Sequence, residues 1–232
     1  DEAASLEEAC QSADLLYLSQ PVDRILITIQ TIAPLVKSGT FVTDAGSTKG
    51  AIVKRAGELL PDKSFLGGHP MAGKETRGAG AADASLFCSR PYILTPSGHP
   101  HSPHENEFRE LLRLMGAIVT DLDANEHDKA VAFTSHLPQL LSTTLAATLQ
   151  NQDNQYFYEV FGPGLIDMTR LALSPADLWA SILSTNREQI ASALTLYCAT
   201  LERAKKDLLE GKFDALFGEA LRFATSIRRI PY

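Results

Sequence analysis

The most constraining feature of this sequence is an alternation of short apolar runs with amphipathic stretches that fills residues 14–122. Runs typical of buried strands lie at 14–18, 40–44, 63–67, 91–95 and 117–122, and apolar residues at helical spacing lie between most of them. Strands that alternate with helices favour a mainly parallel sheet covered on both faces. Such a sheet binds ligands at the carboxyl ends of its strands. The sequence therefore predicts an α/β unit over residues 1–122.

Two helices of this unit are predicted from their ends and faces. Ser5 and Glu8 have the spacing of a capping box, which indicates a helix over residues 5–13. A second helix, over about 103–115, is expected to turn four apolar side chains inward: Phe108, Leu111, Leu112 and Met115.

Strand-like runs stop after residue 122, and the remaining residues, 123–232, are predicted to form an all-α domain. One long helix should end near residue 150 with a kink at Pro138. Another is expected to begin with Ser174 as its N-cap and to end near Gly211, before a last helix over 213–227. An apolar seam in the longest helix suits either a dimer contact or packing within one chain; it consists of Ile190, Leu194, Tyr197, Leu201, Ala204 and Leu208.

Composition excludes several classes of function. The chain of 232 residues is 44% hydrophobic and has a net charge of −7, with no long basic run, so nucleic acid is not an expected partner. We find no apolar stretch of 18 residues and no signal peptide, so no membrane span is expected. The three cysteines are far apart and fit neither a metal site nor a disulfide framework, which favours a reducing cytoplasm.

Two strand ends carry polar groups that point to a site. Ser47 follows the second run, and His69 follows the third, between two glycines and Pro70. If these strands are neighbours, both side chains face one crevice, where a histidine can accept a proton near neutral pH. Gly67 and Gly68 would let a ligand or another backbone come close. The alternatives are an ordinary turn at Ser47 and a structural histidine.

Three further sets of residues are ambiguous from their patterns alone. His136, on a mostly apolar helix, is either structural or part of a pocket. Arg170 is either a surface partner of Asp167 or a clamp for an anion. The loop with His99, His101 and His104 could imitate a metal site, but it has no cysteine and no helix to fix the geometry, so we predict no metal.

Five segments resemble the prephenate and arogenate dehydrogenases of tyrosine biosynthesis in order and approximate spacing. They are "DAGSTKGAI" (44–52), "FLGGHPMAGKETRG" (65–78), "LFCSRPYILTP" (86–96), "EHDKAVAFTSHLPQLL" (126–141) and "GLIDMTRLALSPADLW" (164–179). The resemblance implies a Rossmann-type dinucleotide domain over 1–122 and a helical substrate and dimerisation domain over 123–232. It also implies a homodimer and the oxidative decarboxylation of prephenate or arogenate with NAD or NADP.

The resemblance also implies roles for individual residues. His69 would accept the proton of the substrate's 4-hydroxyl, and Ser47 would touch that hydroxyl and the nicotinamide. Four residues would line or gate the substrate pocket: Arg170, as the partner of a carboxylate, with His136, Gln139 and Glu75. Five residues would lie along the cofactor: Ser19, Gln20, Pro21, Gly46 and Ser47.

Departures from the family pattern qualify these expectations. Gln139 stands where many members have a histidine. The G-x-G-x-x-G fingerprint is absent, and "GAGAAD" (78–83) lies in the wrong context for it. We therefore expect an N-terminally shortened chain that binds dinucleotide weakly, with the choice between NAD and NADP open. The rival hypotheses are another hydroxyacid-type dehydrogenase and a non-enzymatic helical dimerisation module with an incomplete cofactor domain.

Overall fold

A computed structural model describes residues 5–60, 65–73, 79–96 and 103–230 of the chain. Its centre is a five-stranded sheet in the order β1-β2-β3-β4-β5. The strands are β1 (Leu15–Leu18), β2 (Phe41–Asp44), β3 (Phe65–Pro70), β4 (Pro91–Thr95) and β5 (Ile118–Asp121). Strands β1, β2 and β3 run parallel, β4 is antiparallel to β3, and β5 is parallel to β4. The predicted mainly parallel sheet is confirmed.

Strand β3 differs from the prediction in a way that matters for the site. The sequence indicated a strand that ends at residue 67, whereas β3 continues to Pro70. The extension pairs with β4, with His69 opposite Ile93 and Pro70 opposite Tyr92. His69 therefore lies inside a strand, held by the sheet, and not in the loop after it.

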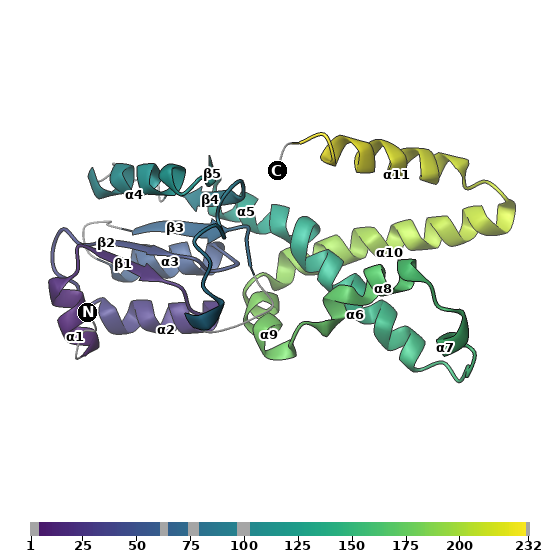
Figure 1. The fold of residues 1–232 in the computed structure, drawn as a ribbon, viewed down its shortest axis with the longest axis horizontal. Coiled ribbons are helices and arrows are strands. Elements are labelled where there is room, and N and C mark those ends of the chain that lie inside the picture. The colour runs from purple at the N-terminus through teal and green to yellow at the C-terminus, as the bar shows by residue number, and fades with distance from the viewer. Residues whose placement is uncertain (1–4, 61–64, 74–78, 97–102, 231–232) are drawn as a thin grey trace.

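Helices cover both faces of the sheet, as predicted. One face packs against α1 (Leu6–Ser12), α2 (Val22–Ile32) and α3 (Gly50–Leu59) around buried Ile25, Ile29 and Ile52. The other face packs against α4 (Pro103–Leu114), and Figure 1 shows α4 on the opposite side of the sheet from α2 and α3. The predicted cap of α1 is confirmed, because Ser5 accepts a hydrogen bond from the Glu8 N–H at 3.1 Å.

The inward face of α4 was predicted only in part. Phe108 and Leu112 are buried against Tyr92 and Leu94 of the sheet. Leu111 and Met115 are exposed, at 47% and 37%. A single helix turns only one stripe toward a sheet, and these two side chains lie beside that stripe.

The helical part begins with α5 (Ala124–Val131), a π-helical turn η3 (Ala132–His136) and α6 (Leu137–Gln150). The π turn ends two residues before Pro138, which has no N–H to donate, so the predicted distortion at this proline is observed. Three short elements follow: α7 (Phe157–Val160), α8 (Pro163–Thr169) and the 3₁₀ turn η4 (Arg170–Leu173).

The single helix predicted from Ser174 to Gly211 is two helices. They are α9 (Ala176–Thr185) and α10 (Arg187–Glu210), and the break falls at Asn186, whose backbone leaves the helical region at ψ 28°. Ser174 is not the N-cap, because it closes η4 and Pro175 occupies the cap position. The predicted end at Gly211 is confirmed by its left-handed backbone, with φ 70°.

The apolar seam of α10 packs within the chain only in its first half, and its use as a dimer contact stays a prediction. Ile190 is buried, and Leu194 and Tyr197 pack against it in the helical core. Leu201 and Leu208 are 50% and 66% exposed. In Figure 1, α10 reaches away from the sheet, and α11 (Asp214–Ile227) runs back alongside α10. No helix in the described part of the chain is long and apolar enough to cross a membrane.

Candidate functional site

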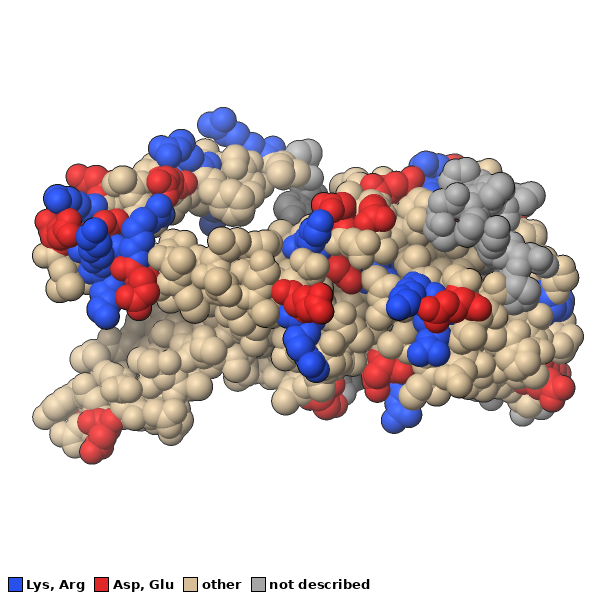
Figure 2. All heavy atoms as spheres, turned by 180° about the vertical axis from the view of Figure 1, so that it is seen from behind, with Lys and Arg blue, Asp and Glu red and all other residues tan. Residues whose placement is uncertain are grey.

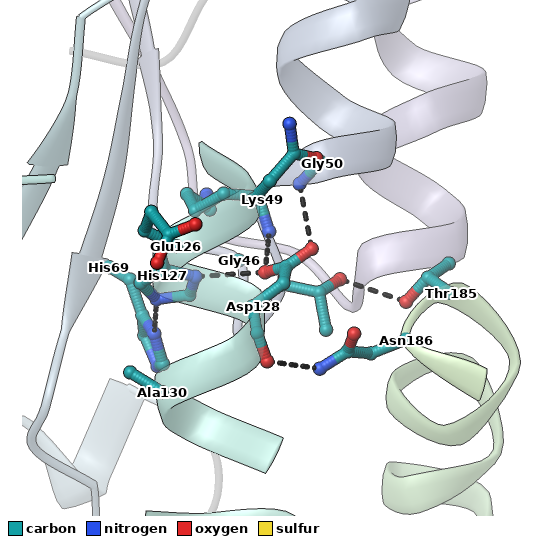
Figure 3. Close-up of polar contacts among 12 residues, drawn as sticks. Gly46, Lys49, Gly50, His69, Glu126, His127, Asp128, Ala130, Thr185 and Asn186 are labelled. Atoms are coloured by element: carbon teal, nitrogen blue, oxygen red, sulfur yellow. Dashed lines mark hydrogen bonds and ion pairs between the residues drawn. The ribbon is translucent and has the colours of Figure 1, made fainter. Parts of the chain in front are cut away.

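His69 is a buried side chain whose ring is fixed by another histidine. It is 9% exposed, and its Nδ1 lies 2.8 Å from Nε2 of His127 on α5. The two rings meet edge to face at an interplanar angle of 70° (Figure 3). Because β3 holds the backbone of His69 and α5 holds its ring partner, the ring has one orientation in the folded chain.

His127 is in turn held by Asp128, the next residue of α5. Its Nδ1 lies 2.8 Å from Oδ1 of Asp128, and the histidine is fully buried. Asp128 also accepts the backbone N–H groups of Lys49, at 2.7 Å, and of Gly50, at 2.8 Å. These N–H groups open helix α3, which is a favourable place for a carboxylate. A hydrogen-bonded chain therefore runs from the start of α3 to His69 (Figure 3).

His127 and Asp128 were not among the residues predicted from the sequence, although a signal for them exists. The buried positions of α5 and η3 follow a helical stripe, and its next positions toward the N-terminus are these two polar residues. A histidine and an aspartate that extend an apolar stripe face the interior, where polar groups require partners.

A second buried network holds the backbone beside His69. Lys49 forms an ion pair with Asp44, and its Nζ also donates to the Gly68 carbonyl at 2.6 Å. Asp44 accepts the N–H groups of Gly46, at 2.7 Å, and of Gly68, at 3.1 Å. The burial of the ammonium lowers the pKa of Lys49, and the Asp44 carboxylate opposes that shift. This network joins the end of β2 to the residue before His69.

The two glycines before His69 make room for protein groups. A Cβ on Gly67 would lie 2.1 Å from Oγ1 of Thr95, and a Cβ on Gly68 would lie 2.5 Å from the Asp44 carbonyl oxygen. Of the two uses that the sequence left open, the close approach of other chain segments explains both glycines.

Burial keeps His69 and His136 neutral. The pKa of His69 is well below its ordinary value of 6.5, first because the ring is desolvated and then because of His127, Lys49 and His136. Burial also lowers the pKa of His136 to about 4; Asp128 opposes this shift, and His127 adds to it. At neutral pH both rings therefore have one bare nitrogen that can accept a hydrogen bond.

His136 lies in the same region as the chain of hydrogen bonds. It occupies the last position of η3, its ring packs edge-on against Trp179 of α9, and its Nδ1 lies 3.3 Å from Nδ2 of Asn186. The same Asn186 amide donates to the Asp128 carbonyl at 2.8 Å. The break between α9 and α10 thus supplies the group that links His136 to α5.

Gln139 joins α6 to η4, the turn that Arg170 begins, at another corner. The Gln139 amide donates to the Leu171 carbonyl at 2.8 Å, and Ser142 accepts the Ala172 N–H at 3.0 Å. Gln139 is buried, and Arg170, the first residue of η4, is exposed in the single chain. Gln139 lies one helical turn after His136, so α6 connects this corner to the histidines. Glu75 lies outside the described residues.

The five predicted cofactor residues line one pocket of about 340 Å³ at the carboxyl ends of β1 and β2. Part of helix α9 forms its opposite wall, including Asp177 and Ser181. The Ser181 hydroxyl is buried without a hydrogen-bond partner, so the pocket wall holds an unsatisfied polar group. Ser47 belongs to the pocket, and β2 is the neighbour of β3, which carries His69.

The residues described by the structure contain no group of three or more histidine, cysteine, aspartate or glutamate side chains that could hold a metal ion. His104 pairs with Glu107 at 3.1 Å, and His99 and His101 lie outside the described residues.

Comparison with known proteins identifies the family. Residues 1–121 match the family described as "Prephenate dehydrogenase, nucleotide-binding domain", and residues 123–222 match "Prephenate dehydrogenase, dimerization domain". The prephenate dehydrogenase of Lactococcus lactis subsp. cremoris is 36% identical over 193 residues, which are 81% of this chain and 52% of that protein. The chain thus spans about half the length of this relative.

Solved structures give the same result. The prephenate dehydrogenase of A. aeolicus in complex with hydroxyphenyl propionate and NAD+ has a TM-score of 0.86 at 26% identity, over 97% of this chain and 79% of that one. The arogenate dehydrogenase of Synechocystis has a TM-score of 0.83 at 26% identity, over 97% of this chain and 81% of that one. In sequence and in fold, the chain belongs to the prephenate dehydrogenase family.

Proposed function

We propose that the protein oxidises and decarboxylates prephenate to 4-hydroxyphenylpyruvate, with NAD or NADP as the hydride acceptor, and that His69 is its proton acceptor. The observation that carries this proposal is a neutral, buried histidine fixed in β3, the strand next to β2, whose carboxyl end lines a pocket together with that of β1. The A. aeolicus relative is a complex with NAD+ and a hydroxyphenyl compound, which supports the same class of ligands here.

The reaction needs few groups from the protein. The ring carbon that bears the 4-hydroxyl gives a hydride to the nicotinamide, which is the chemistry that the cofactor supplies. The hydroxyl proton passes to the bare nitrogen of His69 as the carbonyl forms. The bond between the ring and its carboxylate then breaks and CO2 leaves. The electron pair of that bond completes the aromatic ring, and the former carbonyl oxygen takes up a proton to become the phenol hydroxyl. The protein's task is to place the substrate and to accept one proton.

The remaining predicted residues divide between the two ligands. Ser19, Gln20, Pro21, Gly46 and Ser47 would hold the dinucleotide in their common pocket. Arg170 would pair with a substrate carboxylate, next to the turn that Gln139 supports, and His136 would line the same space. Glu75 would gate the cleft. Two helical domains would associate into a homodimer, in keeping with the dimerization domain that residues 123–222 match.

Arogenate carries an amino group where prephenate carries a keto oxygen, so both substrates are assayed.

The hydroxyacid-type alternative normally uses a lysine of the helical domain, whereas Lys129 forms an exposed pair with Glu126 at 2.6 Å. The protein should oxidise prephenate or arogenate and leave 3-hydroxy acids unchanged.

Two variants separate the proposed roles. His69→Asn should lower kcat by about 10²- to 10⁴-fold, the usual contribution of a general base. Arg170→Gln should raise KM for prephenate by about tenfold or more, because it removes a charged hydrogen bond to a carboxylate. A near wild-type rate of His69→Asn would remove His69 from the reaction, and an unchanged KM would remove Arg170 from the carboxylate site.

A further inference from the structure

The hydrogen-bond chain behind His69 begins at two backbone N–H groups, which can only donate and therefore set the direction of its first hydrogen bonds. We propose that His127 and Asp128 are positioning residues that hold His69 in the tautomer with a proton on Nδ1 and a bare Nε2. This inference rests on the proposed function for its catalytic meaning, but the tautomer itself is a property of the folded chain.

The assignment starts at helix α3. The backbone N–H groups of Lys49 and Gly50 can only donate, so both oxygens of Asp128 are acceptors. Toward Asp128, His127 must then donate, which places its proton on Nδ1. We take this as the single ring proton of the fully buried His127, so that its Nε2 is bare. The Nδ1 of His69, 2.8 Å away, must supply the proton of that hydrogen bond.

The consequence for His69 is a bare Nε2 on the opposite side of the ring. This nitrogen is the one that can accept the hydroxyl proton of a substrate. In the other tautomer, Nε2 would carry a proton, and it would have to be lost before the ring could act as a base. In histidine-dependent enzymes a second group that sets the tautomer is a recurring device.

The chain of hydrogen bonds also connects the two parts of the molecule. His69 belongs to the sheet, while His127 and Asp128 belong to the first helix after it. Asn186 donates to the backbone carbonyl of Asp128 from the break between α9 and α10 (Figure 3). The orientation of the proton acceptor therefore depends on the correct seating of the helical domain against α3.

Other charged groups surround this chain and are compatible with the assignment. Lys49 and His136 face His69 from α3 and from η3, and both disfavour a positive charge on it. Asp44 is engaged with Lys49 and with two backbone N–H groups. The Asp128–His127 pair is thus the group that orients the His69 proton.

Two variants of His127 test the proposal. In His127→Gln, the amide oxygen can replace Nε2 as the acceptor for His69, while the link to Asp128 is lost. In His127→Phe, the ring is kept and the acceptor is removed. Matched substitutions of the exposed His104, to glutamine and to phenylalanine, serve as controls.

The first measurement is two-bond ¹H–¹⁵N NMR of the histidine rings in this chain, at neutral pH and without ligands. The wild type should show His69 with a protonated Nδ1 and a bare Nε2. His127→Gln should keep this pattern, and His127→Phe should change it toward a protonated Nε2. A wild-type His69 with a protonated Nε2 would overturn the proposal, even if His127→Phe failed to fold.

The second measurement is the steady-state kinetics of the protein with prephenate and the dinucleotide. His127→Phe should lower kcat by about 10²-fold or more with KM changed by less than about threefold, and His127→Gln should recover at least about tenfold of that loss. A purely packing role would predict the reverse order, because phenylalanine fills the buried site better. Kinetics in that order would overturn the positioning role. If the wild type oxidised neither prephenate nor arogenate, the proposed function would fail, while the NMR result would still decide the tautomer.

Discussion

At the scale of single residues, the site depends on histidines that the fold keeps neutral. His69 and His136 are both buried, and desolvation is the largest cause of the lowered pKa of each. A proton acceptor with a depressed pKa remains a base at pH values where an exposed histidine would be protonated. We expect the acid limb of the pH profile of kcat/KM to lie below pH 6.5 for this reason.

The stability of the chain should depend on pH through His136. In the unfolded chain this histidine has an ordinary pKa near 6.5, whereas in the folded chain its pKa is about 4. As the pH falls below 6.5 the unfolded state binds the proton first, so the free energy of unfolding decreases until the pH reaches the folded pKa. The loss is on the order of 1 kcal/mol per pH unit.

Denaturant unfolding at pH 7.5 and at pH 5 measures this effect. His136→Phe should be less stable than the wild type at pH 7.5, because the hydrogen bond with Asn186 is lost, but its stability should decrease less between the two pH values. His104→Gln is the control and should follow the wild type. An equal decrease in His136→Phe and the wild type would contradict the assignment.

At the scale of elements, the turn between β2 and α3 is held by one buried ion pair. Both side chains, Asp44 and Lys49, are fully buried, and together they satisfy Gly46 N–H, Gly68 N–H and the Gly68 carbonyl. Removing one partner leaves the other charge buried without its counter-charge, which costs about 3–5 kcal/mol. The turn and the start of α3 should therefore lose order together.

Lys49→Met tests this prediction. Its free energy of unfolding should be lower than that of the wild type by about 3 kcal/mol or more, measured by denaturant titration. Lys54→Met, an exposed lysine of the same helix, should change it by less than about 0.5 kcal/mol. If both variants had similar stability, the ion pair would not be the element that holds the turn.

The elements themselves could mostly be predicted from the sequence. The strands and the helices that cover the sheet follow from the alternation of apolar runs, and the end at Gly211 follows from the need for a left-handed backbone. The extension of β3 through His69 could not be predicted, because the stabilising partner, β4, is more than 20 residues away. The break at Asn186 was missed for a similar reason: its amide is used by Asp128 and His136, both more than 45 residues earlier.

The candidate site was predicted where a local pattern carries it. Pro70 and the glycines marked His69, and the family resemblance of several segments indicated the five residues that line one pocket. The support behind His69 was invisible to such patterns, since it joins β3, α3 and α5 through hydrogen bonds between distant segments. A helical stripe that continues into His127 and Asp128 is the only local trace of it.

At the scale of the whole molecule, the helical part presents much apolar surface to solvent. Large exposed side chains lie on α10 and on α11, including Leu208, Phe217, Leu221 and Phe223. Figure 2 shows areas without charged side chains on the helical part, while positive and negative side chains mix at the end of that part far from the sheet and over the sheet domain. Apolar patches of this extent mark interaction surfaces in proteins. Residues 123–222 match a dimerization domain, so a second copy of the chain is the expected occupant.

The double variant Phe217→Glu/Leu221→Glu tests this dimer. The two side chains lie one helical turn apart on α11 and are 70% and 68% exposed in the single chain. We expect the wild type to sediment as a dimer and the double variant to have a dissociation constant at least about 100-fold higher, because each buried unpaired carboxylate opposes association by more than about 1 kcal/mol.

The matched control is Leu114→Glu. Leu114 is also apolar, is 77% exposed and lies on α4 of the sheet domain. It should leave the dissociation constant unchanged in analytical ultracentrifugation, and circular dichroism should show full helix content in all three proteins. If the double variant remained as tightly dimeric as the wild type, the exposed face of α11 would lie outside the interface. If Leu114→Glu dissociated the dimer instead, the sheet domain would carry the contact, and the exposed half of the α10 seam would need another partner.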